Sequence, residues 1–407
     1  MEVFYMARFT LPRDLYHGKG ALEALKTFKG KKAIICVGGG SMKRFGFLQK
    51  AEDYLKEAGM EVKLFEGIEP DPSVETVMKG AAVMQEFEPD WIVAMGGGSP
   101  IDAAKAMWIK YEYPDITFED MCKVFGIPAL RNKAHFCAIS STSGTATEVT
   151  AFSIITDYEK GIKYPIADFE ITPDVAIVDP DLAETMPQKL VAHTGMDAMT
   201  HAIEAYVSIM ATDYTDGLAM KAVKMVFENL PSAYENGAND PIAREHMANA
   251  SCMAGMAFAN AFLGLNHSMA HKLGAFHHLP HGVANAVILT EVMRYNAAEV
   301  PTKMGTFSQY QYPHALARYA ELGRFAGCQG NTDEEVFENF LAKLEVLKEK
   351  IGIKKTIKDY GIDEKYFLDT LDEMTEQAFN DQCTAANPRY PLMKEIKEMY
   401  LKCYYGK

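Results

Sequence analysis

Three continuous apolar runs, each followed by a turn of glycines or small hydroxyl residues, are the feature that most constrains the fold. The runs are Ala33–Val37, Trp91–Met95 and His135–Ile139. None of them alternates apolar and polar residues, which indicates strands that are buried on both faces. Segments with helical periodicity separate the runs, and parallel strands need such crossovers. The pattern therefore predicts an α/β fold with a doubly wound parallel sheet.

Weaker signals extend this pattern and indicate where it ends. Further short strands are expected at Arg8–Pro12, Val62–Phe65 and Val175–Val178. Ser73 is a suitable N-cap for a helix that ends at Phe87. From about Thr185 onward only helical periodicity remains. We therefore expect a dinucleotide-binding α/β domain at residues 1–184 and an all-helical, metal-binding and catalytic domain at residues 185–407.

Composition excludes several classes of protein. The net charge of −14 argues against binding to a nucleic-acid backbone, which needs clustered lysine and arginine. No apolar run is long enough to span a membrane, and the N-terminal residues do not resemble a signal peptide. The seven cysteines form no C-x-x-C pair, as is usual in a reducing compartment. We expect a cytoplasmic protein that acts on a small molecule.

The turn after the second apolar run can hold a phosphate group. It consists of Gly96, Gly97, Gly98 and Ser99 and precedes a predicted helix, whose first N–H groups are free to bind an anion. Ligands of open α/β sheets bind beyond the carboxyl ends of the strands, where a second set of hydroxyls lies at Thr142, Ser143 and Thr145. The usual G-x-G-x-x-G fingerprint is absent, and a plain tight turn is the alternative. Two such loops together favour a dinucleotide.

The turn after the first apolar run indicates which dinucleotide binds. It consists of Gly38, Gly39, Gly40 and Ser41, with Lys43 and Arg44 just beyond. NAD sites commonly place an acid here, where it accepts a hydrogen bond from the ribose 2′-hydroxyl and repels a 2′-phosphate. Because this turn has a hydroxyl and two cations instead of an acid, we expect NADP(H) to be favoured over NAD(H). The alternative is that both cations belong to a solvated helical turn.

A histidine-rich segment predicts a metal site. Five of the eleven histidines fall between Leu265 and Gly282, and upstream an aspartate and a histidine stand four residues apart on a predicted helix. We predict one metal ion bound by Asp197, His201, His267 and His281. Isolated histidines on helices are more often hydrogen-bonded or exposed than metal-bound, but two successive H-x3-H pairs among apolar neighbours are hard to explain by packing. One carboxylate with three imidazoles suits Fe(II), Zn(II) or Mn(II).

These motifs together resemble the iron-containing (group III) alcohol dehydrogenases. The segments that carry the resemblance are SSTSGTATEVT, GMDAMTHAIEAY, GLNHSMAHKLGAFHHLPHG and DQCTAANPRYPL, in the family's order and over nearly the whole chain. The GGGS-x-K-[RK] turn is most similar to that of the NADPH-dependent butanol dehydrogenases. The resemblance implies the dehydroquinate synthase-like fold and the same four metal ligands, and it favours iron.

The resemblance also implies roles for residues that spacing alone does not identify. Family cofactor contacts fall on Gly38, Ser41, Gly97, Gly98, Ser99, Asp102, Thr142, Ser143, Thr145, Lys163 and Leu182. His271 matches a histidine close to the nicotinamide, and Phe152 and Phe258 match positions that line the substrate pocket. Gly38 stands where NAD-preferring members have an aspartate, which agrees with the expectation of NADP(H).

The function implied is a metal-dependent alcohol dehydrogenase or aldehyde reductase. Hydride passes between NADP(H) and a short- or medium-chain primary alcohol or aldehyde, with the metal as a Lewis acid on the substrate oxygen. A homodimer or larger homo-oligomer is expected. The alternatives are an NAD-dependent glycerol or diol dehydrogenase, a metal-dependent lyase of the dehydroquinate synthase type, and a nucleotide-sensing binding protein with a structural metal.

Overall fold

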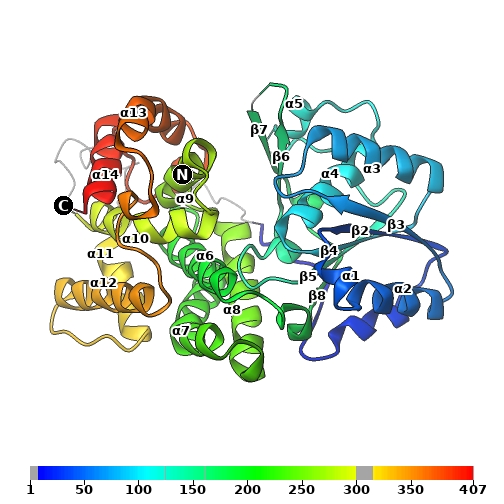
Figure 1. The fold of residues 1–407 in the computed structure, drawn as a ribbon, viewed down its shortest axis with the longest axis horizontal. Coiled ribbons are helices and arrows are strands. Elements are labelled where there is room, and N and C mark those ends of the chain that lie inside the picture. Colours follow the sequence, from blue (N-terminus) through cyan, green and yellow to red (C-terminus); the bar gives the residue numbers. More distant parts are fainter. Residues whose placement is uncertain (1–7, 124, 161, 299–314, 407) are drawn as a thin grey trace, which may run out of the picture. The chain divides into compact units, whose positions relative to one another are not determined.

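The structure is a computed structural model that describes residues 8–123, 125–160, 162–298 and 315–406. The chain forms two compact units, Met1–Thr185 and Met186–Lys407. We had expected a division between residues 184 and 185. Strands and helices alternate in the first unit, whereas the second is built from helices (Figure 1).

The first unit contains a six-stranded sheet in which every neighbouring pair is parallel. In spatial order its strands are β1 (Asp14–His17), β8 (Val175–Val178), β5 (His135–Ser140), β4 (Trp91–Gly96), β2 (Lys32–Gly38) and β3 (Glu61–Ile68). Along the chain, β3 follows on one side of β2, whereas β4, β5 and β8 follow on its other side. The winding therefore reverses between β2 and β4, as in a doubly wound sheet, and the predicted fold class is confirmed.

Helices cover both faces of this sheet, which explains why its strands do not alternate. In β4, Ile92 belongs to one hydrophobic cluster and Val93 to another, and Ile34 and Ile35 of β2 divide in the same way. The first cluster includes residues of α3 (Val74–Phe87) and α4 (Gly98–Glu112), and the second includes residues of η1 (Ala21–Thr27) and α2 (Phe47–Glu57). The first unit also contains two four-residue α-helices, α1 (Ser41–Arg44) and α5 (Phe118–Met121).

Two parts of the first unit differ from the expectations. The strand expected at Arg8–Pro12 is wrong: β1 begins at Asp14, beyond Pro12, which has no N–H to donate to a ladder. A two-stranded antiparallel hairpin, β6 (Phe152–Asp157) and β7 (Ile162–Ala167), was not expected. Serine, threonine and lysine interrupt its apolar pattern, and β7 contains a proline that is tolerated because both strands are edges.

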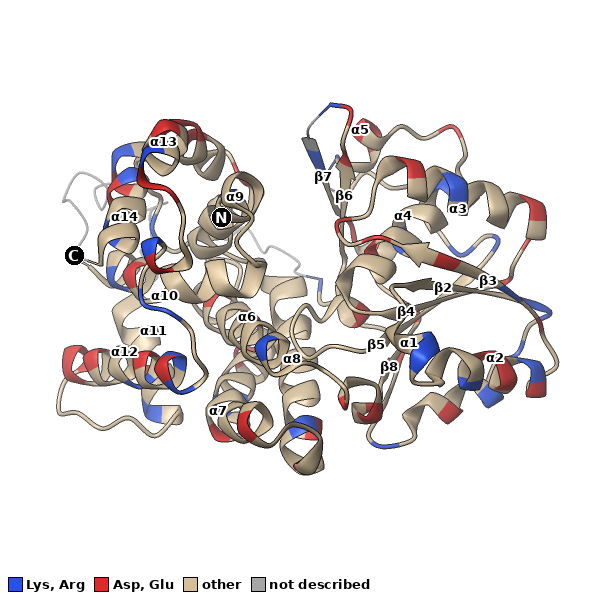
Figure 2. Cartoon of the chain, in the orientation of Figure 1, with Lys and Arg blue, Asp and Glu red and all other residues tan. Residues whose placement is uncertain are grey.

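The second unit contains no strand within residues 186–298 and 315–406. Its helices are α6 (Gln188–Val207), α7 (Asp213–Asn236), α8 (Pro241–Ala261), α9 (Leu265–His277), α10 (His281–Ala297), α11 (Ala315–Phe325), α12 (Asp333–Lys350), α13 (Glu364–Phe379) and α14 (Met393–Tyr405). Charged side chains concentrate on α12 and α13, whereas α8 and α9 are almost free of them (Figure 2). The charge-poor helices form the core of this unit.

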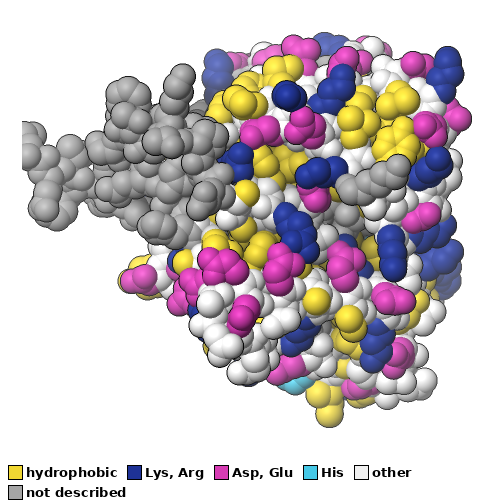
Figure 3. All heavy atoms as spheres, turned by 90° about the vertical axis from the view of Figure 1, so that its left-hand side faces the viewer, with side chains coloured by type: hydrophobic (Ala, Val, Ile, Leu, Met, Phe, Trp, Pro, Cys, Tyr) yellow, Lys and Arg dark blue, Asp and Glu magenta, His cyan; other side chains and the backbone are white. Residues whose placement is uncertain are grey.

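Acidic and basic side chains are interspersed on the face drawn in Figure 3, and they form no large patch of one sign there. Among the described residues, no single helix is long and apolar enough to cross a membrane. One bent pair, α8 and α9, meets the criteria of length and composition, with an angle of 107° at its break.

A buried lysine fastens the loop after β5 to α4. The side chain of Lys105 is fully buried, and its ammonium donates to the carbonyl oxygens of Thr147 (2.8 Å), Thr150 (2.7 Å) and Phe152 (3.0 Å). Burial lowers the pKa of Lys105, and the negative charges of Asp102 and Glu148 oppose that shift. One cation therefore satisfies three carbonyls and balances two carboxyl groups.

We expect Lys105→Met to lower the free energy of unfolding of this unit by about 3 kcal/mol, because it strands buried carbonyls and carboxyl groups. Both tryptophans of the chain, Trp91 and Trp108, lie in this unit, so urea unfolding followed by tryptophan fluorescence measures it selectively. The control is Lys56→Met, which removes only an exposed pair with Glu52 and should cost less than about 1 kcal/mol. Equal losses in the two variants would contradict this interpretation.

Candidate metal centre and cofactor-binding loops

Four side chains from three helices of the second unit converge on one point. Asp197 and His201 lie one turn apart on α6, His267 lies in the first turn of α9, and His281 begins α10. One ligand atom from each lies within 4.8 Å of all the others. The structure therefore brings together the four residues predicted as metal ligands.

The spacing of these atoms fits donors around a shared ion. The Oδ1 atom of Asp197 lies 4.0 Å from Nε2 of His201, 3.8 Å from Nε2 of His267 and 3.4 Å from Nε2 of His281. These distances are too long for hydrogen bonds. Donor atoms bound at about 2.1 Å to one tetrahedral ion lie about 3.4 Å apart, which is close to the observed spacing.

The protonation of the centre also suits a cation. Asp197, His201 and His267 are buried, whereas His281 is exposed. Burial lowers the pKa of His267 well below its ordinary value, and the neighbouring imidazoles lower it further. His267 is therefore neutral at pH 7 and offers a lone pair, which is the form that binds a metal ion.

A buried glutamate sets the orientation of one of these imidazoles. Nδ1 of His267 makes a very short contact with Oε2 of Glu204, whose Oε1 accepts from the backbone N–H of Asn266 at 2.7 Å. A proton on Nδ1 leaves the lone pair of Nε2 directed at the centre. Burial raises the pKa of Glu204 to about 8, and backbone hydrogen bonds at the start of α9 oppose that shift. A cation at the centre would favour the charged carboxylate further.

Glu204 was not predicted from the sequence. It stands seven residues after Asp197 and three after His201, so all three lie on one face of α6. This spacing was the signal that could have identified it.

Asn285, one turn after His281 on α10, was also missed. Its fully buried amide donates to Oδ1 of Asp197 at 2.8 Å, and the same nitrogen lies 3.1 Å from Nε2 of His267 and 3.2 Å from Nε2 of His281. An amide group has two protons and here faces three acceptor atoms. The ligand set therefore offers more lone pairs than the amide can satisfy, and a cation would use them.

Close packing of α10 against α6 positions His281. A Cβ atom at Gly282 would lie 1.9 Å from the carbonyl oxygen of His193, so any larger residue would push the two helices apart. The glycine thus lets the first residue of α10 approach Asp197.

His271 lies beside the four ligands and not among them. Its ring stacks on that of His281, with centroids 5.4 Å apart, and its Nδ1 lies 3.1 Å from Oδ2 of Asp381. Lys272 donates to the same oxygen at 2.9 Å. Although burial raises the pKa of Asp381, His271 and Lys272 hold that pKa well below its usual range. Asp381 is a further residue that the sequence did not reveal as part of the site.

A second group of donors, His271, Asp381 and Cys383, is less suited to a metal ion. The ammonium of Lys272 already neutralises Asp381, and burial raises the pKa of the Cys383 thiol well above its ordinary value. His277, also in the histidine-rich segment, packs against Tyr366 and Phe367 and has a structural role.

The two predicted pocket residues lie in different units. Phe258, on α8, stacks on His201 with ring centroids 4.3 Å apart, so it forms an apolar wall of the metal centre. Phe152 is the first residue of β6 in the first unit and is half-buried. Phe258 therefore contacts a predicted metal ligand. All four ligands belong to the second unit, so the role of Phe152 in the first unit stays a prediction.

In the first unit, the loops after β4 and β5 pack together. A Cβ atom at Gly97 would lie 3.3 Å from Cγ2 of Thr142, and one at Gly98 would lie 3.3 Å from Cγ2 of Thr145. Ser99 follows in the first turn of α4, a helix of fifteen residues whose first N–H groups are directed out of its end. Glycines, hydroxyls and a helix N-terminus thus form one surface, whose groups fit a pyrophosphate.

The turn after β2 is exposed to solvent. Gly39 and Gly40 are exposed, and a Cβ atom on either would meet no atom within 4 Å. Lys43 is exposed and forms an ion pair with Glu66 of β3. The predicted cofactor residues of this turn are therefore accessible to a ligand.

Three residues assigned to the cofactor by resemblance have other contacts. Asp102 accepts the N–H of Ile154 at 3.2 Å, through its side chain. Lys163 is exposed on β7 and pairs with Asp71 at 3.1 Å. Leu182 is buried in the hydrophobic cluster beneath the sheet. Their role towards the cofactor stays a prediction.

Comparison with known families gives two matches that together cover most of the chain. Residues 12–180 match the family described as iron-containing alcohol dehydrogenase. Residues 191–404 match the Fe-containing alcohol dehydrogenase family, C-terminal.

Individual relatives match over nearly the whole chain. The NADPH-dependent butanol dehydrogenase of Clostridium saccharobutylicum is 57% identical over 401 residues, which cover 98% of this chain and 99% of that protein. The bifunctional aldehyde-alcohol dehydrogenase of Escherichia coli (strain K12) is 45% identical over 415 residues, 98% of this chain and 46% of that protein. The chain thus spans about half the length of this bifunctional relative.

Solved structures share the fold. The iron-containing alcohol dehydrogenase of Thermococcus thioreducens has a TM-score of 0.88 at 38% identity, over 98% of this chain and 100% of that one. A 1,3-propanediol oxidoreductase also has a TM-score of 0.88, at 34% identity with the same coverage.

The role of Glu204 can be tested by metal binding alone. We expect Glu204→Gln to weaken the binding of Co(II), followed by its visible absorbance, by about tenfold or more, because the amide no longer holds His267 as a carboxylate does. The control is Glu321→Gln in the same unit, which replaces the charged acceptor of the Tyr206 hydroxyl by a neutral one and leaves the four donors untouched. If both variants bind Co(II) as the unmodified protein does, Glu204 does not organise the centre.

Proposed function

This chain belongs to the iron-containing alcohol dehydrogenase family, and from that membership we propose that it interconverts primary alcohols of short or medium length and their aldehydes with NADP(H). The chain is an oxidoreductase of the alcohol dehydrogenase type. The observation that carries the proposal is the convergence of one carboxylate and three imidazoles in the second unit.

We propose that Asp197, His201, His267 and His281 hold Fe(II). When bound, the ion supplies a Lewis acid that polarises the substrate oxygen. The donor set suits Zn(II) or Mn(II) as well, and the Irving–Williams order alone would favour zinc over iron. The family supports iron.

The residues around the centre exclude water and handle the proton. Phe258 is buried against His201 and makes that side of the centre apolar, and Leu265, two residues before His267 on α9, is fully buried. We assign to His271 the role of accepting the substrate hydroxyl proton at Nε2, because Asp381 engages its Nδ1. The chain's part is to orient the alcohol, keep the site dry and remove one proton.

We propose that the glycine-rich loops of the first unit bind the dinucleotide. Gly97, Gly98 and Ser99, with the hydroxyls of the adjacent loop, would hold the pyrophosphate. Gly38, Ser41 and Lys43, whose turn has no acid, would accept a 2′-phosphate. The NADPH dependence stated for the Clostridium saccharobutylicum relative supports this preference.

The substrate is proposed from the relatives and from the apolar surroundings. The relative at 57% identity is a butanol dehydrogenase, and a structural neighbour acts on 1,3-propanediol, so short diols are the second candidate. A lyase of the dehydroquinate synthase type needs a basic pocket for an anionic substrate. The buried apolar residues Phe258 and Leu265 do not supply such a basic pocket, so they disfavour a lyase.

The proposed partners are a small alcohol or aldehyde and further copies of this chain, as a homodimer or larger homo-oligomer. The net charge of −14 argues against nucleic acid, and we propose no membrane partner. All seven cysteines are free thiols, which supports our proposal of a cytoplasmic location.

The proposal predicts that His267→Ala loses its metal ion and at least about 1,000-fold of kcat/KM for butanal, because the loss of the ion removes several kcal/mol of transition-state stabilisation. NADPH oxidation at 340 nm and the iron content of protein purified without air measure the two effects. The control is His246→Ala, an exposed residue on α8 of the same unit, which should retain both. Full turnover by His267→Ala with no metal ion would refute the proposed function.

A further inference from the structure

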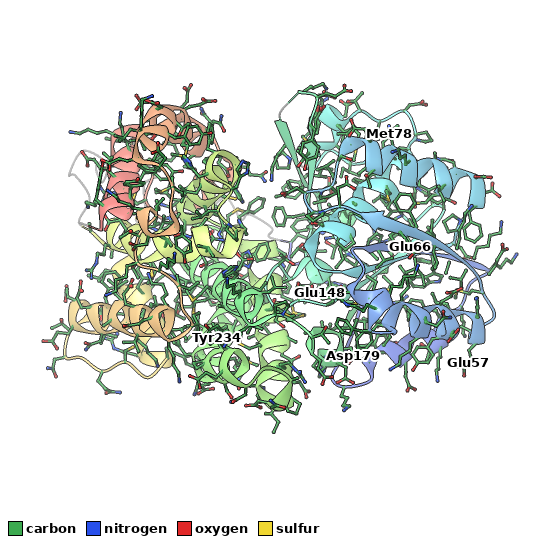
Figure 4. The ribbon with its side chains drawn as sticks, in the orientation of Figure 1. Glu57, Glu66, Met78, Glu148, Asp179 and Tyr234 are labelled. Atoms are coloured by element: carbon green, nitrogen blue, oxygen red, sulfur yellow. The ribbon has the colours of Figure 1, made fainter. Side chains whose placement is uncertain are left out.

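An exposed ion pair joins the turn after β2 to the neighbouring strand. Nζ of Lys43 lies 2.9 Å from Oε1 of Glu66, and the two side chains are 70% and 41% exposed. Lys43 belongs to α1 and Glu66 to β3, and Gly38 at the end of β2 is paired with Ile68 of β3. Glu66 therefore lies at the carboxyl edge of the sheet, where ligands of such sheets bind (Figure 4).

Three carboxylates lie from the end of β3 to the start of α3: Glu66, Glu69 and Asp71. Glu66 forms its ion pair with Lys43 of the β2 turn. Glu69 accepts the N–H of Ser73 at 2.8 Å and so organises the start of α3. Asp71 pairs with Lys163 of the β6–β7 hairpin. Glu66 is thus the acid that a nucleotide at the turn would meet.

Gly38, the first residue of this turn, has little room for a side chain. A Cβ atom at Gly38 would lie 3.0 Å from the carbonyl oxygen of Ile68, which is a tight contact. The turn after β2 has no acid of its own, and the carboxylate of Glu66 from β3 lies beside it, paired with Lys43.

We propose that Glu66 is a specificity-determining residue that limits the preference for NADP(H) and retains the use of NAD(H). This inference rests on the proposed function. Lys43 can pair with Glu66 or with a 2′-phosphate, which carries nearly two negative charges at pH 7 and is repelled by the carboxylate. With NAD(H), Glu66 accepts a hydrogen bond from the ribose 2′-hydroxyl. The exposed pair of Lys43 and Glu66 adds little to the stability of the fold. Lys43 can therefore exchange Glu66 for a 2′-phosphate at a small cost in free energy.

The test is a fluorescence titration of Glu66→Gln with NADPH and with NADH, without metal ion or substrate. We expect the variant to bind NADPH about fivefold more tightly, the factor given by one unit charge about 4 Å away in water. It should bind NADH about threefold more weakly, because a neutral acceptor replaces a charged one. The gain for NADPH should shrink in 1 M salt, which screens the charge.

The matched control is Glu57→Gln. Glu57 is the last residue of α2 and is labelled in Figure 4. It is exposed and pairs with Lys26 at 3.6 Å. Because α2 runs back towards the amino ends of the strands, Glu57 lies at the opposite edge of the sheet from Glu66. This variant should leave both affinities unchanged.

The outcomes separate the inference from the function it rests on. If the unmodified protein binds both nucleotides and the ratio of the two affinities changes by less than twofold in Glu66→Gln, the role of Glu66 is wrong and the proposed function stands. If the unmodified protein binds neither nucleotide, the proposed function fails and the inference fails with it.

Discussion

The metal centre gathers acceptor atoms whose lone pairs repel one another unless a cation or a donor lies between them. Asp197, His201, His267 and His281 direct acceptor atoms at one point, and three of the four are buried. Neutral imidazoles and a carboxylate gathered in this way stabilise one another only through a shared cation or a donor. Asn285 supplies one donor group for three acceptors, which is less than the set can use. The centre is therefore arranged for an ion.

The rest of the second unit positions these donors. Glu204 orients His267 from the same face of α6 that carries Asp197, so one helix supplies both a ligand and the support of another. Gly282 allows α10 to approach α6 closely. In the first unit, the parallel sheet places its glycine and hydroxyl loops at one edge, where backbone N–H groups can bind phosphate. Each unit thus provides one half of the chemistry that a nicotinamide-dependent dehydrogenase requires.

Much of this could be predicted from the sequence because the signals were local. The buried strands such as Trp91–Met95, the glycine turns and the four-residue spacing of Asp197 and His201 depend on neighbours along the chain. The β6–β7 hairpin was missed because polar residues interrupt its pattern. The strand at Arg8–Pro12 was wrong, because the ladder with β8 begins only at Asp14, after Pro12.

The supporting residues of the site were less predictable. Asp381 reaches His271 from more than a hundred residues away in sequence, and nothing local marks it as a partner. Lys43 was recognised as a cation near the cofactor, but its pairing with Glu66 depends on which strand lies next to β2. Such contacts are set by topology, so only the fold reveals them.

The central claim is that one metal ion is held by a carboxylate and three imidazoles. Iron K-edge X-ray absorption spectroscopy of protein purified without air measures the ligand atoms directly. The account predicts a stoichiometric ion whose protein ligands are three imidazole nitrogens and one carboxylate oxygen. A sulfur ligand, or an ion without imidazole in its first shell, would contradict it.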